Sequence, residues 1–171
     1  MNGPIIGFPA QAGQETRNQQ GALCWRMNRG RLEVLLITSR DTGRWVIPKG
    51  WPMEGLGSAE AAACEAWEEA GVEGHILPLP VGFYSYDKAS NGKTLPCMVS
   101  VFPLRVSRLA DKFPERSQRR RKWFTAEKAS RKVAEAELRD LLARFAADPE
   151  ALLAQDPEAN APQAQELTPQ D

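Results

Sequence analysis

Residues 58–71 constrain the fold more than any other segment, because they carry the signals for both ends of a helix. Ser58 is a natural N-cap, and Glu60 places a negative charge in the first turn. The alanine-rich run AEAAACEAWEEA follows, and Gly71 stands where the glycine that ends a helix belongs. The sequence therefore predicts a helix that begins after Ser58 and ends at Gly71.

Three carboxylates lie at the end of this predicted helix. Glu65, Glu68 and Glu69 are spaced at i, i+3 and i+4, so they project from one face. Like charges at this spacing destabilise a helix by roughly 0.2–0.5 kcal/mol per pair. A divalent cation removes that cost, because Mg²⁺ binds one or two carboxylates together with the phosphates of its substrate. The alternative is a solvated acidic helix face, and the flanking residues decide between the two.

The composition places the chain among ordinary globular proteins. Its 171 residues are enough for one domain with a sizeable core. Basic and acidic residues number 22 each, so the net charge gives no reason to expect nucleic acid or an anionic membrane as a partner. We expect no transmembrane helix and no secretory signal. The 3 cysteines show no CxxC spacing and predict reduced thiols in a cytoplasmic protein.

The rest of the chain alternates β-favouring runs with turn signals. The runs GALCWRM and LEVLLIT predict a hairpin, and the Asn91-Gly92 pair predicts a second one. A loop rich in Gly and Pro is expected at 49–57. The predicted strands cover residues 21–27, 32–38, 44–47, 79–86, 94–106 and 122–124.

A second helix is predicted over 126–145, where four apolar residues recur at helical spacing and indicate core packing: Leu138, Leu141, Leu142 and Phe145. We expect residues 1–19 to be loosely ordered, 20–147 to form the domain, and 148–171 to be a disordered acidic tail. Strands, a helix, further strands and a terminal helix fit an α+β class in which helices pack against a mixed sheet.

The stretch from Gly50 to Val72 resembles the Nudix box. That pattern is Gly, five residues, Glu, seven residues, Arg-Glu, an aliphatic residue, any residue, Glu-Glu, any residue, Gly and an aliphatic residue. The matching positions are Gly50, Glu65, Glu68, Glu69, Gly71 and Val72. The segments RWVIPKG and RRRKWFTAEKA are also similar to their counterparts, most of all in the branch that hydrolyses diphosphoinositol and diadenosine polyphosphates. The resemblance covers residues 21–145 and implies an α/β/α sandwich with a mixed sheet between helices.

Two positions depart from the box. Leu56 replaces its first glutamate, and Cys64 replaces its arginine. In the family this arginine is understood to orient the helix carboxylates, so its loss is expected to weaken catalysis more than metal binding. Glu54 is a candidate to replace the missing carboxylate.

The resemblance also implies roles for the acidic residues. Glu65 and Glu69 would hold Mg²⁺, or Mn²⁺ in its place, with the Gly50 carbonyl as a further ligand. Glu68 would be a third ligand or the base that deprotonates a water molecule. Glu115 lies where related enzymes take an additional ligand or base from outside the box. Its other interpretation is a surface glutamate that balances neighbouring arginines.

Basic and aromatic residues are candidates to contact the substrate. Lys49 and Arg40 match positions that resemble phosphate contacts in the inositol pyrophosphate branch, and Arg26 is a weaker candidate. Arg121 belongs to the basic run 119–122, which is either a rim for a highly charged substrate or a solvated strand edge. Trp51 is expected to stack on a base, to cover the site or to pack in its loop. Tyr84 and Tyr86 are expected to share one face of a strand and to line the pocket.

Two functions follow from these residues. The first is a Mg²⁺-dependent pyrophosphohydrolase whose partner is a small phosphorylated substrate, either a diphosphoinositol polyphosphate or a dinucleoside polyphosphate, or another nucleoside diphosphate derivative. The second is a Nudix-fold protein that binds a ligand or regulates another process, with Cys64 and Leu56 as signs of relaxed catalytic demand. No aromatic residues alternate with the basic run, so no specific nucleic acid is expected. Strong salt-dependent binding of RNA through residues 119–122 would favour a third interpretation, an RNA-processing hydrolase.

Overall fold

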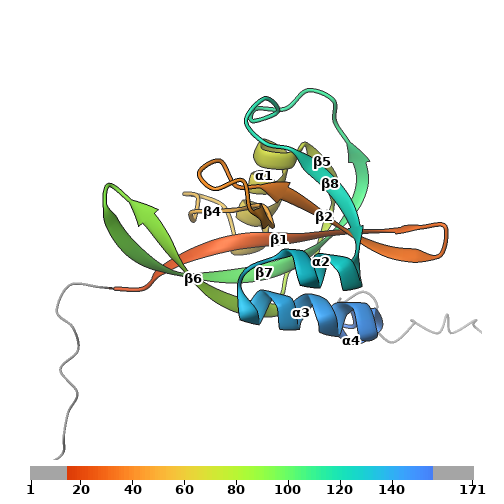
Figure 1. Cartoon of the computed structure of the whole chain (residues 1–171). Helices are drawn as coiled ribbons and strands as arrows, with labels where there is room; N and C mark the ends of the chain where they lie inside the picture. Colours follow the sequence, from red (N-terminus) through yellow and green to blue (C-terminus); the bar gives the residue numbers. More distant parts are fainter. Residues whose placement is uncertain (1–14, 156–171) are drawn as a thin grey trace, which may run out of the picture.

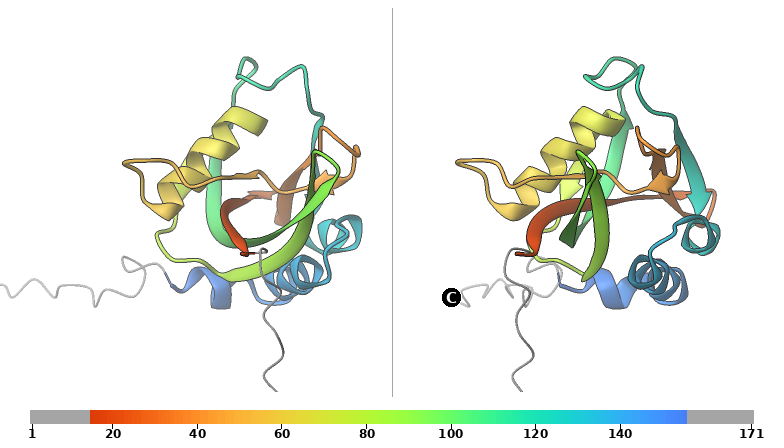
Figure 2. Two further views of the ribbon diagram at one scale, coloured as in Figure 1. Left: turned by 90° about the vertical axis from the view of Figure 1, so that its left-hand side faces the viewer. Right: turned by 60° about the vertical axis from the view of Figure 1, so that its left-hand side comes forward.

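Residues 15–155 are described by the computed structural model, and they form one mixed β-sheet with helices on both faces (Figures 1 and 2). The elements in chain order are β1 (Arg17–Asn28), β2 (Arg31–Thr38), β3 (Trp45–Val46), β4 (Lys49–Gly50), α1 (Ser58–Ala70), β5 (Val72–Ile76), β6 (Gly82–Ser90), β7 (Lys93–Leu109), β8 (Arg121–Thr125), α2 (Ala126–Lys132), α3 (Ala136–Ala147) and α4 (Pro149–Leu153). In this part of the chain, no helix is long and apolar enough to cross a membrane.

Strands β1 and β7 form the centre of the sheet. They run parallel, with Arg17 opposite Cys97 and Trp25 opposite Arg105. The other pairs are antiparallel: β1 pairs with β2 and the short β4, β2 pairs with β3 and β8, and the long β7 pairs with β6 and β5. The sheet is therefore mixed, as predicted.

Alternate residues along the central strands pack into two separate hydrophobic cores, one on each face of the sheet. Ala22 and Cys24 of β1 pack beneath α1, whereas Leu23 points to the opposite face and packs against α2 and α3. Helix α3 contributes the four apolar residues that were predicted to be core, and each is almost completely buried. Helices thus cover both faces of the sheet (Figure 2), which confirms the predicted α/β/α sandwich.

Helix α1 ends at Gly71 as predicted, with a left-handed backbone at φ 66°. Its start differs from the prediction, because Gly57 is the N-cap and Ser58 is already helical with no capping hydrogen bond. The β7–β8 connection covers the C-terminal end of α1. The Glu115 N–H donates to the Glu68 carbonyl at 3.0 Å, and Arg121 donates to the Ala70 carbonyl at 2.7 Å. Carbonyls that a helix end leaves unpaired are satisfied in this way.

The predicted helix over 126–145 is in fact two helices. Val133 has an extended backbone (φ −83°, ψ 151°), buries its side chain in the core and ends α2. The Arg139 side chain donates a hydrogen bond of 2.8 Å to the Val133 carbonyl. The chain therefore turns before α3, and Glu135 takes the N-cap position.

Other boundaries also differ from the prediction. Residues 17–19 open β1 instead of belonging to a loose segment, because they pair with the start of β7. Residues 49–50 form β4 inside the predicted loop, and β5 was not predicted. Within the predicted tail, residues 149–153 form α4. The predictions for residues 1–14 and 156–171 lie outside the described residues.

Candidate functional site

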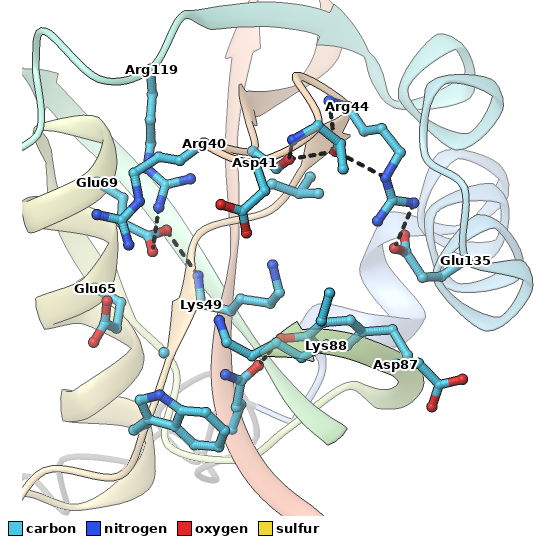
Figure 3. A pocket seen from close by; sticks show the side chains of 18 of the residues that line it. Arg40, Asp41, Arg44, Lys49, Glu65, Glu69, Asp87, Lys88, Arg119 and Glu135 are labelled. Atoms are coloured by element: carbon cyan, nitrogen blue, oxygen red, sulfur yellow. Dashed lines mark hydrogen bonds and ion pairs between the residues drawn. The ribbon is translucent and has the colours of Figure 1, made fainter. Parts of the chain in front are cut away.

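A polar cavity of about 290 Å³ opens between α1, the β2–β3 turn, β6 and the start of α3 (Figure 3). At one side, which we call the α1 end, lie Glu65 and Glu69, with the nearby Glu115 and Arg119. At the opposite side, which we call the α3 end, Arg44 and Glu135 face one another. The side chain of Lys49 lies between the two ends.

Glu65 and Gly50 are packed directly against each other. A Cβ atom at Gly50 would overlap the Glu65 carboxylate, so any larger residue at this position would require Glu65 to move. Burial, followed by the carboxylates of Glu69, Glu68 and Glu115, raises the pKa of Glu65 to about 7. Sequence predicted both residues as part of the site, and the structure brings them together at the α1 end.

Glu69 is held by donors from two other elements. The Lys49 N–H of β4 donates to its carboxylate at 3.2 Å, and the Arg119 guanidinium donates at 3.3 Å. Burial raises the pKa of Glu69 to about 7, although the charges of Arg119 and Lys49 oppose the shift. The side chain is therefore fixed in place while its charge is only partly compensated.

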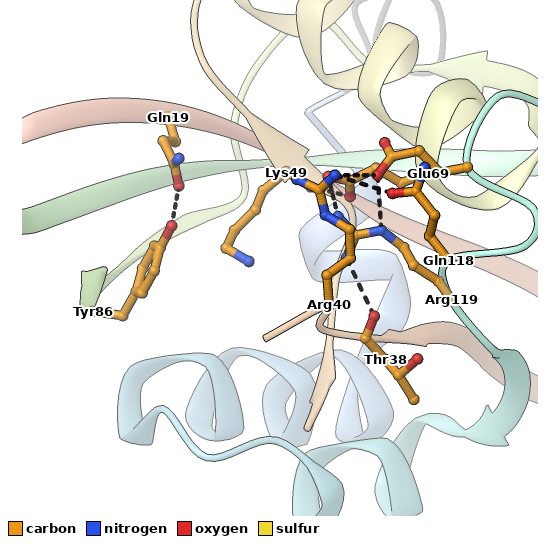
Figure 4. Close-up of polar contacts among 9 residues, drawn as sticks. Gln19, Thr38, Arg40, Lys49, Glu69, Tyr86, Gln118 and Arg119 are labelled. Carbon is orange, nitrogen blue, oxygen red and sulfur yellow. Dashed lines mark hydrogen bonds and ion pairs between the residues drawn. The ribbon is translucent and has the colours of Figure 1, made fainter. Parts of the chain in front are cut away.

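Arg119 links three segments at the α1 end (Figure 4). Besides Glu69, its guanidinium donates to Glu115 at 3.3 Å and to the Thr38 carbonyl at 3.2 Å. Only 9% of its side chain is exposed. Arg40 also pairs with Glu115, at 3.4 Å. The guanidinium that contacts a helix carboxylate thus comes from the β7–β8 connection, whereas the box position itself carries Cys64.

The third helix glutamate does not line the cavity. The carboxylate of Glu68 lies 3.8 Å from the Cys64 sulfur, on α1 itself. The two positions that depart from the box, Leu56 and Cys64, do not line the cavity either. Glu54, the candidate to replace the missing carboxylate, is exposed in the loop before α1 and is also not a lining residue.

Four basic residues were predicted to contact substrate, and the structure separates them into two pairs. Lys49 and Arg40 line the cavity. Arg26 lies elsewhere, paired with Glu33 at 2.9 Å and stacked over the Trp123 ring at 4.0 Å. Arg121 is bound to the end of α1 and stacks on the Phe113 ring at 4.8 Å. Neither Arg26 nor Arg121 is a lining residue.

Several lining residues were not singled out from the sequence. Arg44 belongs to the turn before β3, and Lys88 belongs to β6. Glu135 is the residue before α3. Trp51 and Tyr86 also line the cavity, whereas Tyr84 is buried in the core instead of sharing the site. Lys49 lies 5.0 Å from the Tyr86 ring, and Lys88 lies 5.9 Å from the Trp51 ring. The hydroxyl of Tyr86 is hydrogen-bonded to Gln19 (Figure 4).

The α1 end has the chemistry of a hard-cation site. Glu65, Glu69 and Glu115 line the same end of the cavity, and burial is the main cause that raises the pKa of the first two. Carboxylate oxygens are the ligands that hard cations prefer. In residues 15–155, no three His, Cys, Asp or Glu side chains are already arranged around a common metal position. Arg119 instead bridges Glu69 and Glu115. The donors fit Mg²⁺, provided that this arginine moves aside or shares the carboxylates.

Comparison with known proteins matches the chain to one family. The model of the NUDIX domain matches residues 17–145. Nudix hydrolase 12, mitochondrial, of Arabidopsis thaliana is 35% identical over 103 residues, which cover 58% of this chain and 51% of that protein. Human diphosphoinositol polyphosphate phosphohydrolase 3-alpha is 31% identical over 117 residues, 66% of each chain. The chain thus spans about half the length of the first relative and two thirds of the second.

A solved structure shares the fold at lower sequence identity. The Ap4A hydrolase of C. elegans, crystallised as a binary complex, superposes with a TM-score of 0.60 and 24% identity. The match covers 80% of this chain and 99% of that one. The likeness supports the α/β/α arrangement described above.

Proposed function

The chain belongs to the Nudix family, and on that premise we propose that it is a Mg²⁺-dependent hydrolase of diphosphate bonds. Its substrates would be diphosphoinositol polyphosphates or dinucleoside polyphosphates. The proposal rests on Glu65, which is half-buried, and Glu69, which is buried. Both lie beside β4 at one end of a cavity that also contains cationic side chains. Human diphosphoinositol polyphosphate phosphohydrolase 3-alpha and the Ap4A hydrolase fold point to the two substrate classes.

Residues at different places along the cavity would have different roles in the reaction. Glu65 and Glu69 would hold the cation, which supplies charge neutralisation for the phosphate oxygens. Lys49 and Arg40 would contact the phosphates, because both line the cavity next to these carboxylates. Glu115 would accept the proton of the attacking water, since it is the remaining carboxylate at the α1 end.

The test is a panel of inositol pyrophosphates, dinucleoside polyphosphates, nucleotide sugars and nucleoside triphosphates, assayed with and without Mg²⁺. We expect wild-type protein to release phosphate or nucleotide only with the cation. Glu69→Gln should lower that rate by roughly a hundredfold or more, because a ligand matters at least as much as its supporting partners. Glu73→Gln is the matched control, since Glu73 is an exposed residue of β5 outside the cavity. Equal rates in Glu69→Gln and wild type would refute the metal assignment.

A binding or regulatory role is the second candidate, and the thiol of Cys64 favours it. This half-buried side chain faces Glu68 and has no positive charge with which to orient a carboxylate. Cys64→Arg separates the two functions. A weakened enzyme should gain up to about tenfold in turnover when the arginine is restored. A binding protein should show no turnover before or after the change.

A further inference from the structure

Glu135 at the α3 end has a carboxylate oxygen without a partner. Its side chain is 9% exposed, and its Oε1 atom accepts from Arg44 at 3.5 Å. The Oε2 atom is buried and makes no hydrogen bond to any described residue. Figure 3 shows the carboxylate directed from the start of α3 towards the cavity. A residue that lines this end of the cavity therefore holds a buried acceptor without a donor.

The fold itself does not use this oxygen. Glu135 is the N-cap of α3, yet its side chain makes no capping hydrogen bond. The contact between α3 and β6 is made by a different carboxylate, because Glu137 accepts from the Ser85 N–H at 3.0 Å. Leaving an acceptor unpaired in a buried position is costly, so this atom needs a hydrogen-bond donor that no described residue supplies.

The chemistry of a carboxylate limits what can bind there. An ionised carboxylate only accepts hydrogen bonds, and it repels phosphate. Arg44, which faces this carboxylate, already pairs with it. Asp41 adds a second carboxylate to the wall between the two ends. The α3 end therefore fits an O–H or N–H donor, whereas the α1 end fits phosphate and a cation.

We propose that Glu135 Oε2 accepts a hydrogen bond from a hydroxyl or amino group of the substrate, and that the substrate is accordingly a nucleoside polyphosphate. This inference rests on the proposed function and chooses between its two substrate classes. A nucleoside carries ribose hydroxyls and, in adenosine, an amino group. A fully phosphorylated inositol ring has no free hydroxyl and would place phosphate against this carboxylate. The Trp51 and Tyr86 rings that line the cavity offer faces on which a base can stack.

Equilibrium binding tests the inference without depending on turnover. The probes are ADP and inositol hexakisphosphate, titrated calorimetrically into wild type, Glu135→Ala and Glu135→Gln. We expect Glu135→Ala to weaken ADP binding by about tenfold or more, as for other hydrogen bonds to charged groups. Inositol hexakisphosphate should bind wild type more weakly than ADP and should bind Glu135→Ala more tightly than wild type. Glu137→Gln is the control on the same helix, and its ADP affinity should match that of wild type.

Analogues of ADP identify the donor. In 2′,3′-dideoxyadenosine diphosphate the ribose hydroxyls are missing, and in inosine diphosphate the amino group is replaced. The analogue that lacks the relevant donor should bind wild type and Glu135→Ala with equal affinity. The inference is overturned if Glu135→Ala changes no affinity, or if inositol hexakisphosphate binds wild type more tightly than ADP. A protein that binds ADP through Glu135 but hydrolyses nothing would refute the proposed function alone.

Discussion

The two ends of the cavity are built differently. The α1 end combines a helix, the short strand β4 and a connection that is hydrogen-bonded to both β2 and α1, and its central cation, Arg119, is 9% exposed. The α3 end is assembled from a turn and a helix start, and its cation, Arg44, is 47% exposed. Main-chain hydrogen bonds thus position the groups that would do the chemistry. In the proposed function, the more open α3 end would contact the part of the substrate that does not react.

The largest expected difference between the ends is in stability. Arg119→Ala removes a buried cation from Glu69 and Glu115, so it should lower the free energy of unfolding by about 3 kcal/mol when a chelator is present. Arg44→Ala removes a largely solvated partner and should cost about 1 kcal/mol or less. Urea unfolding of both variants gives the comparison.

Added Mg²⁺ provides the control for this pair. It should restore part of the stability of Arg119→Ala, because the cation returns positive charge to the same carboxylates. It should leave the difference between Arg44→Ala and wild type, measured at the same Mg²⁺ concentration, unchanged, because the α1 carboxylates are intact in both proteins. Equal losses in the two variants would show that the α1 end is no more preorganised than the α3 end.

Close packing at Gly50 gives the next largest effect. Gly50→Ala places a methyl group where the Glu65 carboxylate lies, so Glu65 must move. We expect turnover to fall by roughly a hundredfold, which is typical when a catalytic group is displaced by about 1 Å. Gly57→Ala is the control, because a Cβ there would approach nothing closer than 3.9 Å. Steady-state rates of the two alanine variants decide whether Gly50 has this role; similar rates would mean that Glu65 tolerates displacement.

The pH dependence of stability provides a smaller test of the α1 end. The pKa values of Glu65 and Glu69 are raised to about 7, so the folded protein retains protons there that the unfolded chain releases above about pH 4.5. Relative to Glu65→Gln/Glu69→Gln, wild type without metal should lose about 1 to 2 kcal/mol of unfolding free energy between pH 4.5 and 7. Saturating Mg²⁺ should remove the difference. Parallel stability curves without metal would contradict the assigned shifts.

Part of the α1 end could be predicted from the sequence because its residues lie close together along the chain. Gly50, Glu65 and Glu69 belong to one spaced pattern within a helix and the strand before it, and the structure brings them together. Helical spacing alone could not show that Glu68 points to Cys64 instead of into the cavity. The β-favouring runs likewise indicated where most strands lie along the chain.

The α3 end could not be predicted because no local pattern defines it. Glu135 was hidden inside a single predicted helix, since the break after α2 depends on the burial of Val133 in the tertiary core and not on a glycine or proline.

At the α1 end, Arg119 was recognised only as part of a basic run. Its approach to Glu69, 50 residues away in sequence, results from the way the β7–β8 connection covers α1.

Direct measurement of cation binding tests whether the α1 carboxylates form a divalent metal site. Mn²⁺ can be titrated into wild type and Glu65→Gln/Glu69→Gln while the electron paramagnetic resonance signal of the free ion is recorded, with Glu73→Gln as the control. We predict that wild type and the control deplete free Mn²⁺, that Mg²⁺ competes for the site, and that the double variant leaves the ion free. Equal depletion by the double variant and wild type would show that Glu65 and Glu69 are not needed to bind the ion.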